Sequence, residues 1–236
     1  MSIARKHFEK TLAAQQASPD ETNQVRANAN QYELMMAQLH SHIQTLKGVQ
    51  SITTKCDLKA EFLADYQPYI EGVLESNSGT ADDVLMTVML WSIDAGNFNN
   101  ALDIGEYSLK HKLEMPDKYN RSTACILIEE IATAALNATD EPIVSLEQLC
   151  RLSTLATNQD YPDQVKAKLD KALGYAYRAA EMPKLAVESL RSALALNPRA
   201  GVKQEIKALE KLLPISPNPA SNIENNTEKN TEASTS

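Results

Sequence analysis

Two pairs of neighbouring acidic residues have the side chains that metal chemistry would need. They are Asp82 with Asp83, and Glu129 with Glu130. Metal-dependent nucleases use two or more carboxylates that converge on a divalent ion such as Mg2+, which activates water and steadies the leaving oxygen. Each pair also has a structural interpretation, because acids at a helix start favour the helix dipole and acids on the edge of an apolar helix face water. The catalytic residues are therefore left unassigned, and Mg2+ is expected only if these acids form a nuclease site.

The glycines and cysteines exclude several cofactor classes. The seven glycines never cluster, so the sequence has neither a P-loop nor a dinucleotide-binding loop, and no motif for a bound cofactor is recognised. Cys56, Cys125 and Cys150 are odd in number and widely spaced, which indicates free thiols in a reducing compartment. No apolar run approaches the ~18–20 residues of a membrane span, and the N-terminus lacks the apolar core of a signal peptide. We therefore expect a cytoplasmic protein with no membrane partner.

A stripe of basic residues near the C-terminus could bind phosphate groups. In the segment RAGVKQEIKALEKLL, cations recur at every fourth position and apolar residues fall between them. On a helix this spacing gives one basic face and one apolar face. Each phosphate contact would add salt-dependent affinity, since it releases counterions. The predicted DNA-binding residues of this segment are Arg199, Lys203, Lys207 and Lys211.

The same segment has a second interpretation, as a lysine-rich face that is simply hydrated. Glu205 and Glu210 dilute the basic stripe, and exposed lysines are common on protein surfaces. Another candidate for DNA contact is the N-terminal segment, where Arg5 and Lys6 are followed by Lys10. Both interpretations of the C-terminal stripe stay open at this point.

The net charge of −8 is distributed unevenly along the chain. Residues 63–150 contain 15 acidic and 4 basic residues, whereas residues 151–213 contain 11 basic and 7 acidic residues. Such asymmetry can orient a protein between an anionic ligand and a basic partner. An uneven scatter of hydrated surface charge is the alternative.

The elements that would position these residues are helices. Nearly every segment of the body has helical periodicity, and no alternating strand is found, so we predict an all-α fold. A stripe from Tyr32 to Leu46 indicates an amphipathic helix that either packs on the body or forms a short oligomerisation coil. A second helical element, containing Leu58 to Leu74, is expected to be interrupted at Pro68.

The segment from Thr80 to Pro116 predicts two packed helices at the centre of the fold. Thr80 is expected to cap the first helix, which is apolar almost all round and so belongs between other helices. Gly96 should end it, and the partner helix should run from Asn99 to about His111.

Further helices are predicted at Ser122–Leu136 and Ser145–Ala156, followed by a tetratricopeptide (TPR)-like pattern in residues 163–198. In that pattern small residues such as Gly174 and Ala186 let two antiparallel helices approach closely. We thus expect an irregular stack of helical hairpins with a TPR-like C-terminal unit. The predicted divisions are a polar N-terminal arm (1–24), a helical core domain (25–160), the TPR-like unit (161–213) and a disordered tail (214–236).

Seven segments resemble, in order, the small (endonuclease) subunits of the terminases of temperate tailed phages. The likeness covers about residues 30–213, and DDVLMTVMLW followed by the Asp-Ala-Gly turn is its most specific part. The segments are YELMMAQL at Tyr32, PYIEGVLE at Pro68, DDVLMTVMLWSIDAGN at Asp82, ALDIGEYSLKHKLEMP at Ala101, IEEIATAAL at Ile128, PDQVKAKLDKALGYAYR at Pro162 and AGVKQEIKALEKL at Ala200.

The resemblance implies a role in packaging viral DNA. A member of this family would recognise the cohesive-end site in concatemeric double-stranded phage DNA and help to cut it in the bacterial cytoplasm. Its partners would be the large ATPase subunit and the procapsid with its portal, and a homo-oligomer stays open. The alternative is a non-catalytic helical-repeat adaptor that binds the large subunit without DNA or nuclease activity of its own. Because no nuclease motif is recognisable, the endonuclease activity is implied by the resemblance alone.

Overall fold

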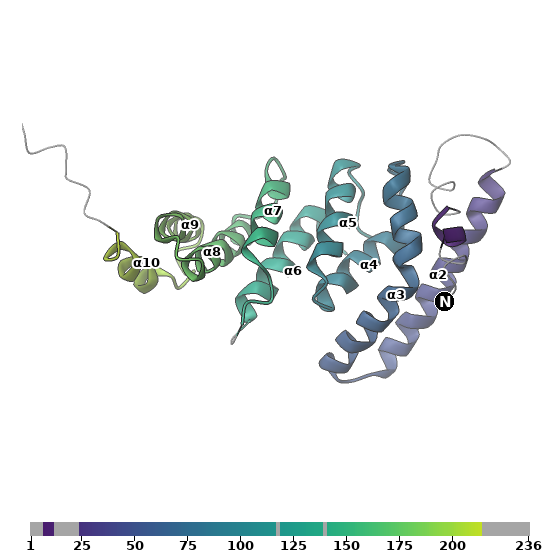
Figure 1. Ribbon diagram of the computed structural model, residues 1–236, viewed down its shortest axis with the longest axis horizontal. Helices are drawn as coiled ribbons and strands as arrows, with labels where there is room; N and C mark the ends of the chain where they lie inside the picture. Colours follow the sequence, from purple (N-terminus) through teal and green to yellow (C-terminus); the bar gives the residue numbers. More distant parts are fainter. Residues whose placement is uncertain (1–6, 12–23, 117–118, 139–140, 214–236) are drawn as a thin grey trace, which may run out of the picture.

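The computed structural model describes residues 7–11, 24–116, 119–138 and 141–213, and the side chains of residues 24–30 fall outside this description. Within these ranges the structure is helices and turns with no strand, which confirms the predicted all-α class (Figure 1). The predicted tail, and Arg5 and Lys6 in the predicted arm, lie outside the described residues. The main helices are α2 (Gln24–Gly48), α3 (Ile52–Ser76), α4 (Asp83–Asp94), α5 (Phe98–Lys110), α6 (Thr123–Asn137), α7 (Leu146–Ala156), α8 (Asp163–Ala179), α9 (Pro183–Leu196) and α10 (Lys203–Glu210).

The apolar stripe of α2 packs on the body of the protein. Leu39 and Leu46 are buried in the main core, and Tyr32, Met36 and Ile43 pack against it. Of the two alternatives for this stripe, packing on the body is therefore the one that is confirmed.

An aromatic cluster joins α2 to α3 and α4. The His42 ring is stacked on Phe62, with centroids 3.8 Å apart and an angle of 4° between the planes. His42 Nδ1 is also hydrogen bonded to the Tyr66 hydroxyl at 2.8 Å, and the ring lies 6.5 Å from that of Trp91. Burial lowers the pKa of His42, and the nearby Asp65 carboxylate opposes this effect. The neutral imidazole is thus the form that suits the folded state.

The predicted interruption at Pro68 is wrong, because α3 continues through this residue. Proline removes one backbone donor and bends a helix rather than necessarily ending it, and α3 changes direction along its length (Figure 1). Both flanks are held by buried side chains, including Tyr66, Ile70 and Val73. Their packing keeps the helix intact on each side of the proline.

The central hairpin forms as predicted, but with a different cap. Asp82, and not Thr80, is the N-cap of α4, and its carboxylate accepts a hydrogen bond from the Leu85 amide at 2.9 Å. The reason is that Tyr69 of α3 donates a hydrogen bond to the same carboxylate, which anchors Asp82 against the body. Gly96 lies in the turn that follows α4 and has a positive φ of 74°. Glycine adopts this conformation without steric cost.

The remaining helices extend the stack towards α10 (Figure 1). Ser122 caps α6 and Ser145 caps α7, as the predicted helix starts require. α8 packs on both α6 and α7, and its residues Val165 and Leu169 belong to the main core. α10 packs on α9 over a second apolar cluster, which is made of Ala186, Val187, Leu190, Val202, Ile206 and Leu209. The predicted division at residue 160 stays a prediction.

The helices α8 and α9 pack closely against each other, and Gly174 lies at their contact. A Cβ atom on Gly174 would lie 2.5 Å from Leu190 Cδ2 and 2.6 Å from its Cγ. Ala186 and Ala193 are fully buried on the facing helix. The small residues of the TPR-like pattern therefore lie where two helices pack.

We predict that Gly174→Ala lowers the free energy of unfolding. Overpacking costs about 1–3 kcal/mol, and the higher helix propensity of alanine returns only about 1 kcal/mol of it. Urea denaturation would measure the change. Gly48→Ala is the matched control, because a Cβ atom there meets nothing within 4 Å. In a Leu190→Ala background, Gly174→Ala should become neutral or stabilising; equal destabilisation in both backgrounds would contradict the packing explanation.

We predict that acid weakens the attachment of α2 through His42. The unfolded chain has an ordinary histidine pKa near 6.5, so it takes up a proton before the folded state does as the pH falls. The free energy of unfolding should therefore decrease from about pH 6.5 downwards, through the lower pKa of the folded protein. Urea denaturation followed by fluorescence of Trp91, the one tryptophan of the chain, would measure it. His42→Gln should reduce this pH dependence, whereas His40→Gln, at an exposed site of the same helix, should retain it.

Candidate nucleic-acid interface

The first acidic pair is divided between a buried and an exposed residue. Asp82 is 7% exposed and bonds to the Tyr69 hydroxyl and to the backbone of α4. Burial raises its pKa, although these hydrogen bonds favour the charged form. Asp83 is exposed on the first turn of α4. The pair thus occupies a helix start, with the Asp82 carboxylate turned into the protein.

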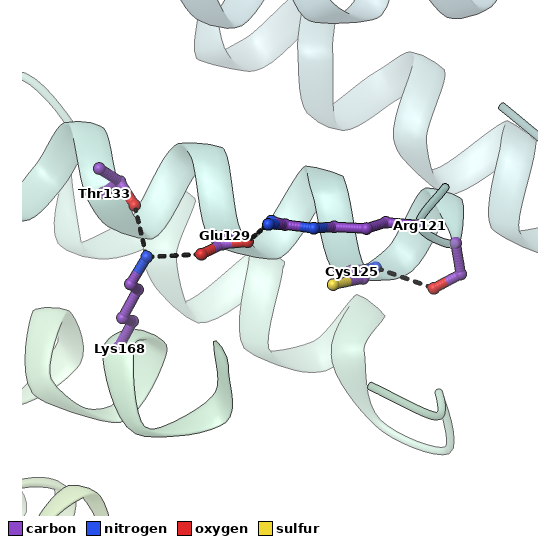
Figure 2. Close-up of polar contacts among 6 residues, drawn as sticks. Arg121, Cys125, Glu129, Thr133 and Lys168 are labelled. Carbon is purple, nitrogen blue, oxygen red and sulfur yellow. Dashed lines mark hydrogen bonds and ion pairs between the residues drawn. The ribbon is translucent and has the colours of Figure 1, made fainter. Parts of the chain in front are cut away.

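Glu129 of the second pair is held by two cations (Figure 2). Its carboxylate pairs with Arg121, which precedes α6, and with Lys168 of α8 at 2.6 Å. The same lysine ammonium lies 3.5 Å from the Thr133 hydroxyl. Because the Glu129 side chain is only 17% exposed, this network joins α6 to α8 at a partly buried site, where ion pairs are screened less than at the surface.

Glu130 is exposed and lies outside that network. It lines a surface pocket of about 510 Å³ together with Asp94, Lys59 and Trp91. Partial burial raises its pKa, and the Glu129 and Asp94 carboxylates add to the effect. Asp94 itself pairs with Lys59 at 2.5 Å.

The two acidic pairs do not converge. The carboxylates that raise the pKa of Glu130 are Glu129 and Asp94, the last residue of α4, whereas Asp82 bonds to α3 and to the start of α4. Among the residues that the structure describes, no group of three His, Cys, Asp or Glu side chains is placed to hold a metal ion. A catalytic role for these four acids stays a prediction.

The predicted basic face lies on α10, at the end of the stack opposite α2 (Figure 1). Lys203, Lys207 and Lys211 are exposed, while Ile206 and Leu209 are buried on the other side of the helix. The two-faced helix is therefore confirmed. It is shorter than the sequence segment suggested, because it begins at Lys203 and ends at Glu210.

Arg199 is not on this helix. It lies in the turn between α9 and α10, and its backbone amide donates a hydrogen bond to the Asn197 side chain at 3.0 Å. The turn residue Gly201 has a positive φ of 76°, and Val202 after it is buried. This turn prevents one helix from running through all four predicted cations, so Arg199 does not continue the helical stripe. The Arg199 side chain is exposed.

The two acidic residues of α10 are bonded to the body of the protein. Glu205 pairs with Arg178 of α8 at 2.8 Å, and Glu210 pairs with Arg191 of α9 at 2.7 Å. Each carboxylate therefore has its charge neutralised by an arginine. Lys203, Lys207 and Lys211, by contrast, make no ion pair with any described residue. In the rest of this text these three residues are called the lysine face.

The contacts that attach α10 to α8 and α9 were not predicted from the sequence. The ammonium group of Lys171 donates a hydrogen bond to the Ala200 carbonyl at 2.8 Å, at the turn before α10. Arg178 and Glu205 are 27 residues apart, and Arg191 and Glu210 are 19 apart. Such separations leave no short-range spacing to detect, since the pairs join different helices.

The described part of the N-terminal segment is bonded to α3. Lys10 pairs with Glu75 of α3 at 2.8 Å and with Glu71 at 3.3 Å. Arg5 and Lys6 lie outside the described residues, so their DNA contact stays a prediction. None of the described helices is long and apolar enough to cross a membrane.

Comparison with known proteins identifies the class to which this helical stack belongs. Residues 36–164 match the family model described as phage small terminase subunit. The match covers more than half of the chain, so the chain belongs to the family of phage small terminase subunits. The matched residues end at the start of α8, which leaves α9 and α10 outside them.

Two relatives share this family resemblance over most of their length. The chain is 38% identical over 219 residues to a protein of Escherichia phage P2 named "Terminase, endonuclease subunit", and the alignment covers 92% of this chain and 88% of the relative. It is 24% identical over 202 residues to the "Probable terminase, endonuclease subunit" of Haemophilus phage HP1, with 78% and 70% covered. No solved structure matches the chain. The resemblance inferred from the sequence motifs is confirmed.

We predict that Asp82→Ala and Asp83→Ala differ in their effect on stability. Asp82→Ala removes the cap of α4 and leaves the buried Tyr69 hydroxyl without its acceptor, which should cost about 1–3 kcal/mol. Asp83→Ala, at an exposed position, should change stability by about 0.5 kcal/mol or less. Thermal denaturation would compare the two variants. If both instead remained as stable as the parent and both abolished DNA cleavage, the pair would be a metal site and the capping role would be refuted.

Proposed function

We propose that this chain binds double-stranded phage DNA at the cohesive-end site and directs its cleavage and packaging into procapsids, together with the large ATPase subunit. Family membership supports this role, because the P2 relative is named a terminase endonuclease subunit. The lysine face of α10 is the observation that carries the DNA-binding part. No residue of the chain is assigned to the cleavage chemistry in this proposal.

The local electrostatics of α10 favour a polyanion. Lysine ammonium groups at Lys203, Lys207 and Lys211 are exposed without a carboxylate partner, and the two acids of the helix are neutralised by Arg178 and Arg191. The net charge of the whole chain is −8, so a duplex would be repelled from the acidic middle. Binding at the basic end and repulsion from the middle would orient the protein on DNA.

In this proposal the α8–α9 hairpin is a TPR-like unit that carries α10, at the end of an irregular stack of helical hairpins. The tight contact of Gly174 with Leu190 supports the likeness to a TPR hairpin. α10 then closes the exposed side of that unit with Ile206 and Leu209. The same burial turns the lysine face outwards.

A second candidate function is a non-catalytic adaptor that holds the large subunit and has no DNA or nuclease activity of its own. It is favoured by the 15 acidic residues in residues 63–150, several of which are exposed, including Glu114 and Glu147. A basic surface of the large subunit would fit this region. The two functions differ in what they predict for DNA affinity.

We predict that Lys203→Glu combined with Lys207→Glu weakens binding to a cohesive-end duplex by about tenfold or more at low salt, because two phosphate contacts are lost. Gel shifts over a salt series would measure it. The matched control is Lys47→Glu with Lys55→Glu, which makes the same change of charge on α2 and α3 at the other end of the stack (Figure 1). Equal affinities for the two double variants would exclude the lysine face. A stable complex with the large subunit without any DNA affinity would instead support the adaptor.

A further inference from the structure

We infer that α10 contacts only the phosphate backbone of the duplex and does not read its bases. This inference rests on the proposed function, which places DNA on the lysine face. It means that the preference for a cohesive-end sequence must come from residues elsewhere in the complex. Four observations about α10 support it.

The side chains of the lysine face suit phosphate groups. A lysine ammonium is a compact point charge that binds a phosphate without needing planar geometry. In the major groove lysine or arginine can also bond to guanine, and asparagine or glutamine to adenine, so the way the helix is held decides which of these ligands the lysines meet. The one exposed residue of α10 with an amide side chain is Gln204.

Part of the start of α10 is bonded to the rest of the protein. In helices that enter the major groove end-on, the N-terminal residues are those that contact the bases. Here the N-cap is Val202, which is fully buried, and the first turn contains Glu205, which bonds to Arg178. Lys203 and Gln204 are exposed at this end, but the N-cap and Glu205 are held within the chain and cannot enter a groove.

The length of the lysine face matches a short run of phosphates. Eight residues separate Lys203 from Lys211, which corresponds to about 12 Å along a helix axis. One DNA strand places a phosphate about every 3.4 Å along the duplex axis, and the phosphates lie further apart along the strand because it winds round that axis. The three lysines can therefore lie beside a few successive phosphates of one strand. A helix laid along the backbone in this way needs no groove contact.

The contacts that attach α10 to the protein favour an arrangement in which the side of the helix, and not its end, faces the DNA. Lys171 holds the preceding turn through the Ala200 carbonyl, and Arg178 and Arg191 hold the helix at two points along its length. Because Ile206 and Leu209 are buried beneath it, the helix presents its side to the solvent. The exposed side of the helix, which carries the lysines, is the side available to DNA.

The test compares affinity with sequence preference in full-length protein. Dissociation constants would be measured for a cohesive-end duplex and for a scrambled duplex of the same length, over a range of salt concentrations. The proteins would be the parent, Lys207→Gln and Gln204→Ala, each checked by circular dichroism. Lys207→Gln should weaken binding to both duplexes by the same factor, with the slope of log affinity against log salt reduced in magnitude by about 0.9. Gln204→Ala should leave the ratio of the two affinities unchanged.

The outcomes separate this inference from the proposed function. A changed affinity ratio in Lys207→Gln or Gln204→Ala would overturn the inference, while DNA binding at α10 would stand. Unchanged affinity for both duplexes after replacing all three lysines by glutamine would overturn the proposed function itself. An equal loss for both duplexes supports the inference. If the parent protein alone shows no preference between them, the same comparison is made on its complex with the large subunit, where the preference would be measured.

Discussion

The enclosure of α4 is the constraint on which the rest of the structure depends. Nine of its twelve residues are buried, so this helix has almost no side that can face water. It is covered by α2, α3, α5 and α6, and the polar groups on it must find partners inside the protein. The Ser92 hydroxyl does so by donating to the Val88 carbonyl at 2.8 Å, while it accepts a hydrogen bond from Asn100. A helix of this kind determines where its four neighbours lie.

The same constraint explains the acids that first suggested metal chemistry. Asp82 begins the enclosed helix and is drawn into the protein by the Tyr69 hydroxyl. Glu129 lies where α6 meets α8, and Arg121 and Lys168 neutralise it there. A buried or half-buried carboxylate is costly unless it is bonded in this way. Two of the four candidate acids thus have structural partners, and neither pair is joined by a third ligand among the described residues.

At the far end of the stack, α10 has an apolar face and a charged face on opposite sides of the helix. Its apolar side closes a small cluster with α9, and its charged side meets the solvent. The neutralisation of Glu205 and Glu210 by arginines of α8 and α9 turns a mixed row of charges into an exposed face of lysines. Exposed ion pairs contribute little to stability, so their main consequence is the pattern of charge that a ligand would meet.

The sequence by itself determined the elements of this protein. Helical periodicity, the helix starts at Ser122 and Ser145 and the glycine turn at Gly96 are local signals, and each predicted a feature that is present. The motif order also indicated the terminase family. Only the tertiary structure decided that Pro68 does not end α3, that Asp82 replaces Thr80 as a cap, and which charges α10 exposes. Each of these depends on groups far apart in the chain, whose attraction arises only once packing has brought their helices together.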